Sequence, residues 1–221
     1  MGLIVYGASL SPFVRKVRVF LAEKGLDYKQ EQVTPFPPPD WFKEISPLGR
    51  IPVLKDEDVG PDATLPDSSA ICAYLERKAP DPALYPKDAF AYGRALWYEE
   101  YADSEFAAAC GIGIFRPVVL NKMMGKEPDR AAAELALKEK LPRFFSYFEK
   151  EIGTKDFLVG GAFSIADIAA ATHFVNVAHA GYGPDAKTWP NLVRYLKAIH
   201  ARPSFARCIA EETGFISKLG L

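Results

Sequence analysis

The stretch SLSPFVRKVRVFLAEKGLDY, residues 9–28, opens with serines and a proline and then continues in the pattern of a helix. Apolar residues recur in it at helical spacing, namely Val14, Val17, Phe20 and Leu21. Ser11 can cap this helix, and Pro12 suits its first position because proline has no N–H to leave without a partner. The free N–H groups of the same helix start also favour an anion. The local sequence leaves both interpretations open.

Short strands are expected on both sides of this helix. The run LIVYG, residues 3–7, is apolar and ends in glycine, which is typical of a buried strand. The helix is expected to stop at Gly25, and the alternating run DYKQEQV, residues 27–33, reads as a second strand. A strand, a helix and a strand in this order form a βαβ unit, which implies parallel neighbours.

The next fifty residues complete a small α/β layer of four strands. The proline-rich stretch 35–49 predicts a loop with a short helical turn at most. Residues 50–56 and 63–68 predict a β-hairpin with a long turn, and residues 68–80 predict a helix that ends at prolines. The first domain therefore reads β-α-β, loop, β-β-α.

The pattern changes to helices after a proline-rich connection. From Ala89 onward strand signals are nearly gone, and helices are expected in four stretches and a short tail: 89–115, 129–153, 165–181 and 190–205. A shift of this kind marks a domain boundary. We therefore expect an α/β domain over residues 1–80 and an all-helical domain over residues 87–221.

Composition excludes several classes of protein. The chain has 221 residues, of which 49% are hydrophobic and 25% charged, as in ordinary globular proteins. The net charge of -1 offers no broad basic field for nucleic acid or an acidic membrane surface. No uninterrupted apolar run approaches the roughly 20 residues that span a bilayer, and the start resembles neither a signal peptide nor a myristoylation site. These features predict a cytoplasmic protein.

Cysteine and histidine spacing argues against a metal site or a disulfide framework. The three cysteines are far apart and odd in number, and no C-x-x-C occurs: Cys72, Cys110 and Cys208. His173 and His179 are six residues apart, which places them on different faces of a helix. No metal and no prosthetic group is therefore expected.

Four short motifs then carry a resemblance to a known family. They are SPF at 11–13, SPLGRIPVL at 46–54, LPDSSAICAYLE at 65–76 and FLVGGAFSIADIAAA at 157–171. Each is weak alone, but their order and spacing across the expected boundary resemble the cytosolic glutathione transferase family. The resemblance covers essentially the whole chain, and it implies a thioredoxin-like first domain and an all-helical second domain.

The resemblance gives Ser11 a chemical role. Glutathione carries a cysteine thiol, whose pKa is about 8.5 when free, and only its thiolate is a nucleophile. Ser11 matches the serine-type members, especially the tau and zeta classes, in which the hydroxyl donates to sulfur; Ser9 is the second candidate donor. Omega-like classes carry cysteine at this position, so serine favours conjugation over disulfide chemistry. The alternative for Ser11 is a plain helix cap.

The same resemblance predicts the other contacts to glutathione. Pro52 is expected to be cis, and Ile51 to present its backbone to the cysteinyl part. Asp67 is expected to pair with the α-ammonium and Ser68 to bind the γ-glutamyl carboxylate, although the family usually has glutamate in place of Asp67. Three further candidates complete the set: Phe13, and Lys43 and Arg50 for the glycyl carboxylate. The alternatives are an edge-strand proline, two helix caps and solvated surface charges.

The electrophile pocket and a partner subunit are expected mainly in the helical domain. Pocket candidates are Phe106, Cys110, Ile114, Phe115 and Phe215, with Phe13 beside them; the alternative is the core, because an aromatic stripe at helical spacing is more often core than pocket. The family is typically homodimeric, and three residues are expected to face the partner: Tyr98, Tyr101 and Asp103. Ser164 and Asp167 have the spacing of a capping box, a folding element.

These residues predict a transferase that joins the glutathione thiolate, as co-substrate, to a small hydrophobic electrophile. Two alternatives stay open. One is a non-catalytic binding or scaffold protein with the same fold. The other is a glutathione-dependent isomerase or peroxidase, which needs the same thiolate.

Overall fold

The computed structural model describes residues 2–34 and 36–221; Pro35, the first residue of the expected loop 35–49, lies outside the described residues. The chain divides into two compact units, one that ends at Leu84 and one that spans Tyr85–Leu221. The division falls in the stretch between the two domains that the sequence suggests. Each unit is described by itself below.

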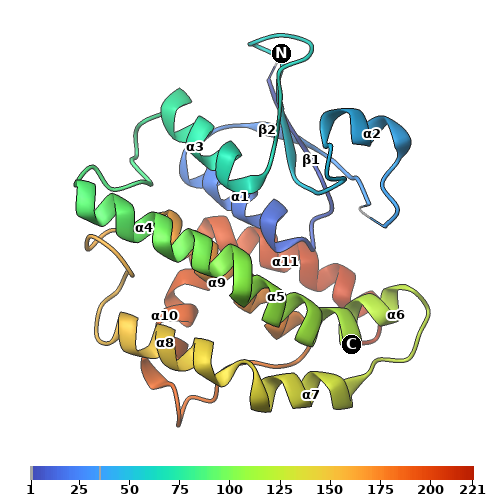
Figure 1. The fold of residues 1–221 in the computed structure, drawn as a ribbon, viewed down its shortest axis with the longest axis vertical. Coiled ribbons are helices and arrows are strands. Elements are labelled where there is room, and N and C mark those ends of the chain that lie inside the picture. Colours follow the sequence, from blue (N-terminus) through green and yellow to red (C-terminus); the bar gives the residue numbers. More distant parts are fainter. Residues whose placement is uncertain (1, 35) are drawn as a thin grey trace. The chain divides into compact units, whose positions relative to one another are not determined.

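The first unit is built on a four-stranded sheet (Figure 1). The strands are β1 (Leu3–Tyr6), β2 (Tyr28–Glu31), β3 (Val53–Asp56) and β4 (Thr64–Pro66), in the spatial order β2-β1-β3-β4. β1 pairs with β2 in parallel, and the β1–β3 and β3–β4 pairs are antiparallel. The expected βαβ unit, hairpin and thioredoxin-like layer are confirmed.

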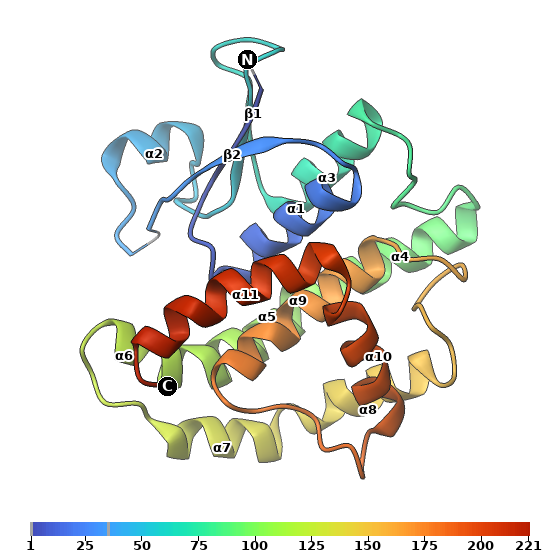
Figure 2. The same cartoon turned by 180° about the vertical axis from the view of Figure 1, so that it is seen from behind.

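Helices cover both faces of this sheet (Figures 1 and 2). They are α1 (Pro12–Glu23), α2 (Asp40–Ile45) and α3 (Ser68–Lys78). α1 and α3 pack against each other, while Phe42 of α2 joins Tyr6 and Val53 in a buried cluster on the other face. Successive strand residues point to opposite faces, so β1 contributes to both layers. The short α2 lies in the stretch expected as loop.

The second unit begins with one helix that runs from Ala89 to Met123. Its parts are α4 (Ala89–Tyr101), the π-helical segment η1 (Ala102–Phe106), α5 (Ala107–Cys110), the π-helical segment η2 (Gly111–Leu120) and α6 (Asn121–Met123). The sequence predicted an end at residue 115. The helix instead continues through Pro117, which lies inside η2. Proline has no N–H and therefore interrupts the ordinary α-helical hydrogen-bond ladder. Wider π turns occur where this ladder is interrupted.

The remaining helices are α7 (Arg130–Glu139), α8 (Pro142–Ile152), α9 (Ile165–His179), α10 (Pro190–His200) and α11 (Pro203–Lys218). Two expectations are wrong here. The helix predicted over 129–153 is two helices, and the tail expected to be short forms most of α11. In both places a proline begins a new helix at its first position. All residues from Ile165 to Val177 are buried, so α9 belongs to the core of the unit.

The helix Ala89–Met123 is long and apolar enough to cross a membrane by length and composition alone. It has 35 residues, and its most apolar window has a mean hydropathy of 1.2. This finding is weak support for a membrane span, because the core helix of a soluble protein meets the same criterion. The first part of the helix, α4, packs against α9. The sequence analysis missed this helix as a possible membrane span, because it considered only uninterrupted apolar runs.

The cysteines and potential metal ligands can be placed as well. Cys72, Cys110 and Cys208 are buried and form no disulfide bond. Among the described residues, no group of three or more His, Cys, Asp or Glu side chains could hold a metal ion.

Candidate functional site

Strand register brings three distant motifs of the first unit to one edge of the sheet. Tyr6 of β1 lies opposite Val53 of β3, which in turn lies opposite Pro66 of β4. The next residues beyond this row therefore share one edge of the sheet: Gly7, Pro52 and Asp67. Pro52 belongs to the RIPVL motif and Asp67 to the LPDSS motif, and Gly7 lies four residues before Ser11 of the SPF motif.

Ser11 is the N-cap of α1, with extended backbone angles of φ -70° and ψ 126°. Its Oγ accepts a hydrogen bond from the backbone N–H of Val14, but the distance is 3.4 Å, at the long end of such bonds. Its carbonyl oxygen accepts from the N–H of Arg15 at 2.9 Å, which begins the helix ladder. Because Oγ acts as the acceptor in the cap, its own proton stays available to a ligand.

Gly7 allows the start of α1 and the segment before β3 to approach closely. A Cβ at residue 7 would lie 2.5 Å from Val14 Cγ2 and 3.2 Å from Ile51 Cβ, and the φ of Gly7 is 152°. A side chain has no room there. The absence of a side chain at residue 7 thus brings the helix of Ser11 and the backbone of Ile51 together.

Ser9 anchors the loop before α1 to the second strand. Its Oγ accepts hydrogen bonds from the side-chain amides of Gln30, at 3.1 Å, and Gln32, at 3.0 Å. The Gln30 amide also donates to the carbonyl of Gly7. These bonds give Ser9 a structural task, and we keep Ser11 as the candidate donor to sulfur.

The peptide bond between Ile51 and Pro52 is cis, as expected for this position. Pro52 is buried and Ile51 is half-buried. The side chain of Ser46 closes the preceding turn, because its Oγ donates to the carbonyl of Arg50 at 2.7 Å and accepts from the N–H of Arg50 at 3.1 Å. The backbone that leads into residue 51 is therefore held by hydrogen bonds on both sides of Arg50.

Asp67 caps α3 from an unusual backbone conformation. Its Oδ1 accepts from the N–H groups of Ser69, at 2.9 Å, and Ala70, at 3.1 Å. Among residues 2–34 and 36–221, Asp67 is the only residue other than glycine with positive φ, at 82°. Such conformations carry a strain of about 1–3 kcal/mol and cluster at binding sites. The following residue, Ser68, is the first of α3 and only 4% exposed.

The other candidates for glutathione contacts lie at more open positions. Lys43 makes an ion pair of 2.8 Å with Asp40 in α2 and is 57% exposed, and the same pair lowers the pKa of Asp40. Arg50 is exposed and Phe13 is half-buried in the first turn of α1. The pairing of Lys43 within its own helix fits the alternative of a solvated surface charge.

Three of the pocket candidates occupy core positions in the helical unit. The ring of Phe106 packs against those of Phe144, Phe148 and Phe174, and Phe106 is fully buried. Cys110 and Ile114 are buried too, and burial raises the pKa of the Cys110 thiol. These positions match the core alternative. Phe115 is half-buried and Phe215 is 43% exposed, so both keep a surface for a ligand.

The three residues expected to face a partner subunit differ in their burial and in their contacts. Tyr98 is fully buried and its hydroxyl bonds to Glu151, so the expectation for Tyr98 is wrong. Tyr101 is half-buried, and the centroid of its ring lies 4.6 Å from the ring centroid of Tyr147. Asp103 pairs with the buried His173 at 3.2 Å.

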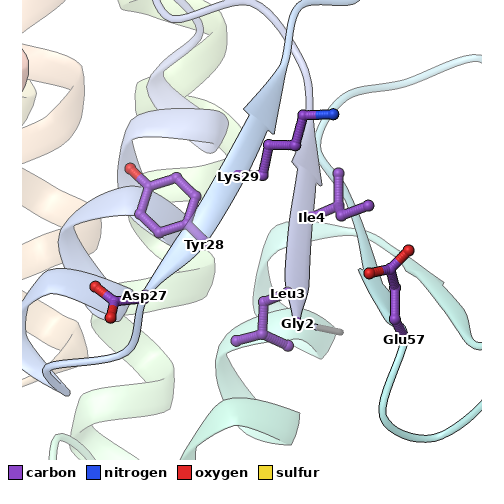
Figure 3. A pocket seen from close by; sticks show the side chains of 7 residues that line it. All are labelled: Gly2, Leu3, Ile4, Asp27, Tyr28, Lys29 and Glu57. Carbon is purple, nitrogen blue, oxygen red and sulfur yellow. The ribbon is translucent and has the colours of Figure 1, made fainter.

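Two open cavities lie away from these residues. One, of about 440 Å³, is near the start of β1, and its lining includes Gly2, Asp27, Lys29 and Glu57 (Figure 3). It lies at the opposite end of β1 from Gly7. The other, of about 610 Å³, lies in the helical unit among α9, α10 and α11. Neither is lined by a residue that the sequence assigns to glutathione.

One residue near the motifs escaped the sequence analysis. Lys16 of α1 is fully buried, and its Nζ donates to Ser69 Oγ at 2.9 Å and lies 3.4 Å from Ser68 Oγ. A signal was present, because Lys16 is four residues before Phe20, on the same side of the helix as an apolar residue. A lysine there is either exposed at the edge of the face or buried with a partner.

Comparisons with known proteins agree with this geometry. Residues 5–83 match the glutathione S-transferase N-terminal domain, and residues 112–203 match the C-terminal domain. The chain is 29% identical to FtsZ-localized protein A of Caulobacter vibrioides, over 91% of this chain and 88% of that protein. It is 28% identical to glutathione S-transferase F13 of Arabidopsis thaliana, over 94% of each chain.

A solved structure extends the likeness to three dimensions. The crystal structure of a glutathione S-transferase from Rhodospirillum rubrum F11 has a TM-score of 0.84 and 30% sequence identity, and the match covers 93% of this chain and 91% of that one. The two domain matches agree with that likeness. The chain belongs to the glutathione S-transferase family.

Proposed function

We propose that this chain is a glutathione transferase that joins the glutathione thiolate to a hydrophobic electrophile. The observation that carries the proposal is the state of Ser11. Its hydroxyl stands at the start of α1, is half-buried, and makes only a long cap bond. A hydroxyl held this way can donate to sulfur while the helix terminus adds positive potential.

The chemistry needs no general base on Ser11. Glutathione gives up its thiol proton to solvent, and the hydroxyl of Ser11 donates a hydrogen bond to the remaining thiolate. The thiolate then attacks an electrophilic carbon, and a carbon–sulfur bond forms as the leaving group departs with its electron pair. Stabilising the thiolate lowers its pKa, so more of it is present near neutral pH.

The rest of the first unit offers matching contacts to the peptide. The backbone of Ile51, beside the cis proline, is the candidate partner for the cysteinyl backbone. The N-terminus of α3, with Ser68 and Asp67, is the candidate site for the γ-glutamyl group. Phe115 and Phe215 are the remaining candidates for contact with the electrophile. We propose a cytoplasmic homodimer, in keeping with the resemblance.

One comparison favours a second candidate function. The name of FtsZ-localized protein A describes a location in the cell and not a reaction. A chain similar to it over nearly its full length can be a binding or scaffold protein with the same fold. Glutathione-dependent isomerisation or peroxide reduction needs the same thiolate, so a panel of electrophiles, isomerisable substrates and peroxides separates these reactions.

We expect the protein to bind glutathione, because three separate segments of the first unit offer matched contacts at one sheet edge. Retention on immobilised glutathione and titration calorimetry with glutathione measure this directly. Cysteinylglycine in its reduced form, which lacks the γ-glutamyl group but keeps the thiol, is the control ligand and should bind more weakly. No binding at millimolar glutathione would favour the scaffold candidate.

We expect near-background thioltransferase activity, because residue 11 is serine and cannot form a mixed disulfide with glutathione. The assay follows reduction of a glutathione–cysteine mixed disulfide. Ser11→Cys should raise this activity and depress conjugation of a chromogenic electrophile. Rapid disulfide reduction by the unmodified protein would show that the role assigned to Ser11 is wrong.

A further inference from the structure

The cavity of about 610 Å³ in the helical unit lies where α11 packs against α9 and α10 (Figure 2). Its volume falls within the range of small-molecule sites, which is roughly 300–1,000 Å³. α11 presents one helix face to it, because the lining residues Ile209, Thr213 and Ile216 are three or four positions apart. The end of α9 contributes Val175 and His179. The wall is therefore mostly apolar and carries a few polar groups.

One histidine of this wall is paired with a buried glutamate. Nε2 of His179 lies 2.8 Å from Oε2 of Glu212 in α11, and the two side chains are 6% and 0% exposed. A carboxylate only accepts hydrogen bonds, so Nε2 carries the ring proton and donates to Glu212. Within residues 2–34 and 36–221, this is the only hydrogen bond of the His179 ring. In the neutral ring, Nδ1 is therefore an acceptor that a ligand can use.

The surroundings of His179 favour a ligand that donates a hydrogen bond over an anion. α9 ends at His179, and the C-terminus of a helix carries negative potential. The carboxylate of Glu212, bonded to the opposite nitrogen of the ring, is shielded from solvent. Both features repel an anion. Arg130 also lines the cavity, but it is exposed, so solvent and salt screen its charge.

We propose that this cavity is a binding site for neutral phenols and alcohols that have a compact apolar body. The hydroxyl of the ligand donates to Nδ1 of His179, while the apolar body contacts Ile209 and Ile216. His200 fixes another part of the wall, because its Nε2 donates to the carbonyl of Ala171 at 3.0 Å. The lining residues all belong to the helical unit, so the inference goes beyond the proposed function and does not depend on it.

The first test compares three naphthalene derivatives that differ in one group. 2-Naphthol donates a hydrogen bond, 2-methoxynaphthalene cannot donate one, and 2-naphthoate is an anion at neutral pH. Titration of the wild-type protein, followed by ligand fluorescence, should give the lowest dissociation constant for 2-naphthol. We expect it about fivefold below that of the methoxy compound, as for one hydrogen bond. Equal or tighter binding of either other ligand overturns the inference.

Two exposed alanines locate the binding. Ala210 lines the cavity, whereas Ala131 in α7 does not. Ala210→Phe places a ring in the cavity and should raise the dissociation constant for 2-naphthol about tenfold or more. Ala131→Phe is the matched control and should leave this constant as in the wild type. If Ala210→Phe binds 2-naphthol like the wild type, the ligand binds elsewhere and the inference is wrong.

A third variant tests the acceptor. His179→Phe removes Nδ1, so 2-naphthol and its methyl ether should bind equally well, and a retained preference overturns the role of His179. If this variant does not fold, nitrogen NMR of the wild-type histidine rings decides. The Nδ1 signal of His179 should move on addition of 2-naphthol and stay in place with 2-methoxynaphthalene; an unmoved signal overturns the assignment. Loss of the proposed function would appear separately, as absent glutathione binding by the wild type.

Discussion

Replacing Ser11 with alanine is expected to raise the pKa of bound glutathione by about one to two units and to slow conjugation near neutral pH roughly ten- to a hundredfold. The variant loses a charge-assisted hydrogen bond to the thiolate, while the helix terminus remains. Thiolate absorbance in the ultraviolet, followed against pH with glutathione bound, measures the pKa. Affinity for glutathione should change less, because the proposed contacts at Ile51 and Ser68 do not involve the hydroxyl of Ser11.

The cap explanation makes a different forecast for the same variant. Loss of a cap alone costs about 0.5–2 kcal/mol of folding free energy and leaves the thiol titration unchanged. We expect the low end of that range, because the Val14 N–H lies 3.4 Å from Oγ. Ser11→Thr should keep most of the pKa shift, and Ser9→Ala should leave it unchanged. A Ser11→Ala protein with an unshifted titration would leave only the cap.

The largest stability loss is expected at Asp167. This side chain is fully buried in the first turn of α9, and its Oδ1 accepts from the N–H of Leu158 and the hydroxyl of Tyr195, each at 2.9 Å. Its Oδ2 accepts from Ser164, and the two residues form the expected capping box. Asp167→Ala leaves buried donors without a partner, so we expect a loss of about 3–5 kcal/mol in the free energy of unfolding.

Denaturant titration followed by far-ultraviolet circular dichroism measures this loss. Asp129→Ala is the matched control, because Asp129 caps α7 by a bond of 2.9 Å to Ala132 but is exposed. Its loss should stay near 1 kcal/mol, as for ordinary caps. Equal losses of unfolding free energy in the two variants would mean that the buried hydrogen bonds of Asp167 stabilise the fold no more than an exposed cap does.

The contribution of Asp167 to stability should also depend on pH. Burial raises the pKa of Asp167 from its ordinary 3.8 to about 6, against the lowering effect of its hydrogen bonds. The contribution of this group to stability is therefore fully present below 3.8 and is lost as pH rises through about 6. Relative to Asp167→Asn, the wild type should be more stable at pH 4 than at pH 7. A difference that grows toward neutral pH would contradict the raised pKa.

The sequence predicted the first unit well because its signals are local. Short apolar runs end at glycine or proline, and this punctuation marks β1 and the start of α1. The capping box at Ser164 was also readable, since its two residues are three apart. In each case the residues that decide the structure lie within one turn of each other.

Helix ends in the second unit were predicted less well. Pro142 and Pro203 were read as interior residues of longer helices, although proline at the first position begins a helix. Pro117 gave the opposite error, because the helix passes through it in wider turns. A proline in the sequence does not by itself show whether it begins a new helix or lies within a continuing one. The packing of the flanking apolar residues decides between these two structures.

The candidate site was predictable in its motifs and not in its charges. The resemblance of their motifs to those of the family located Ser11, Ile51 and Ser68, and strand register explains why Gly7, Pro52 and Asp67 of these segments lie at one end of the sheet. Lys16 was missed because its partners are 52 and 53 residues away. The burial of Tyr98 and Phe106 was ambiguous for the same reason, since a helical stripe shows which residues share a face but not what covers it.

The burial of Cys72, Cys110 and Cys208 has a practical consequence for spectroscopy. Thiol reagents react with exposed thiolates, and buried thiols are inert. A single cysteine placed at Val59, an exposed residue of the turn between β3 and β4, would therefore carry a spin label or fluorophore with no prior removal of native cysteines. That turn is at the end of the hairpin opposite Pro52 and Asp67, so the label would report on the molecule without touching the candidate site.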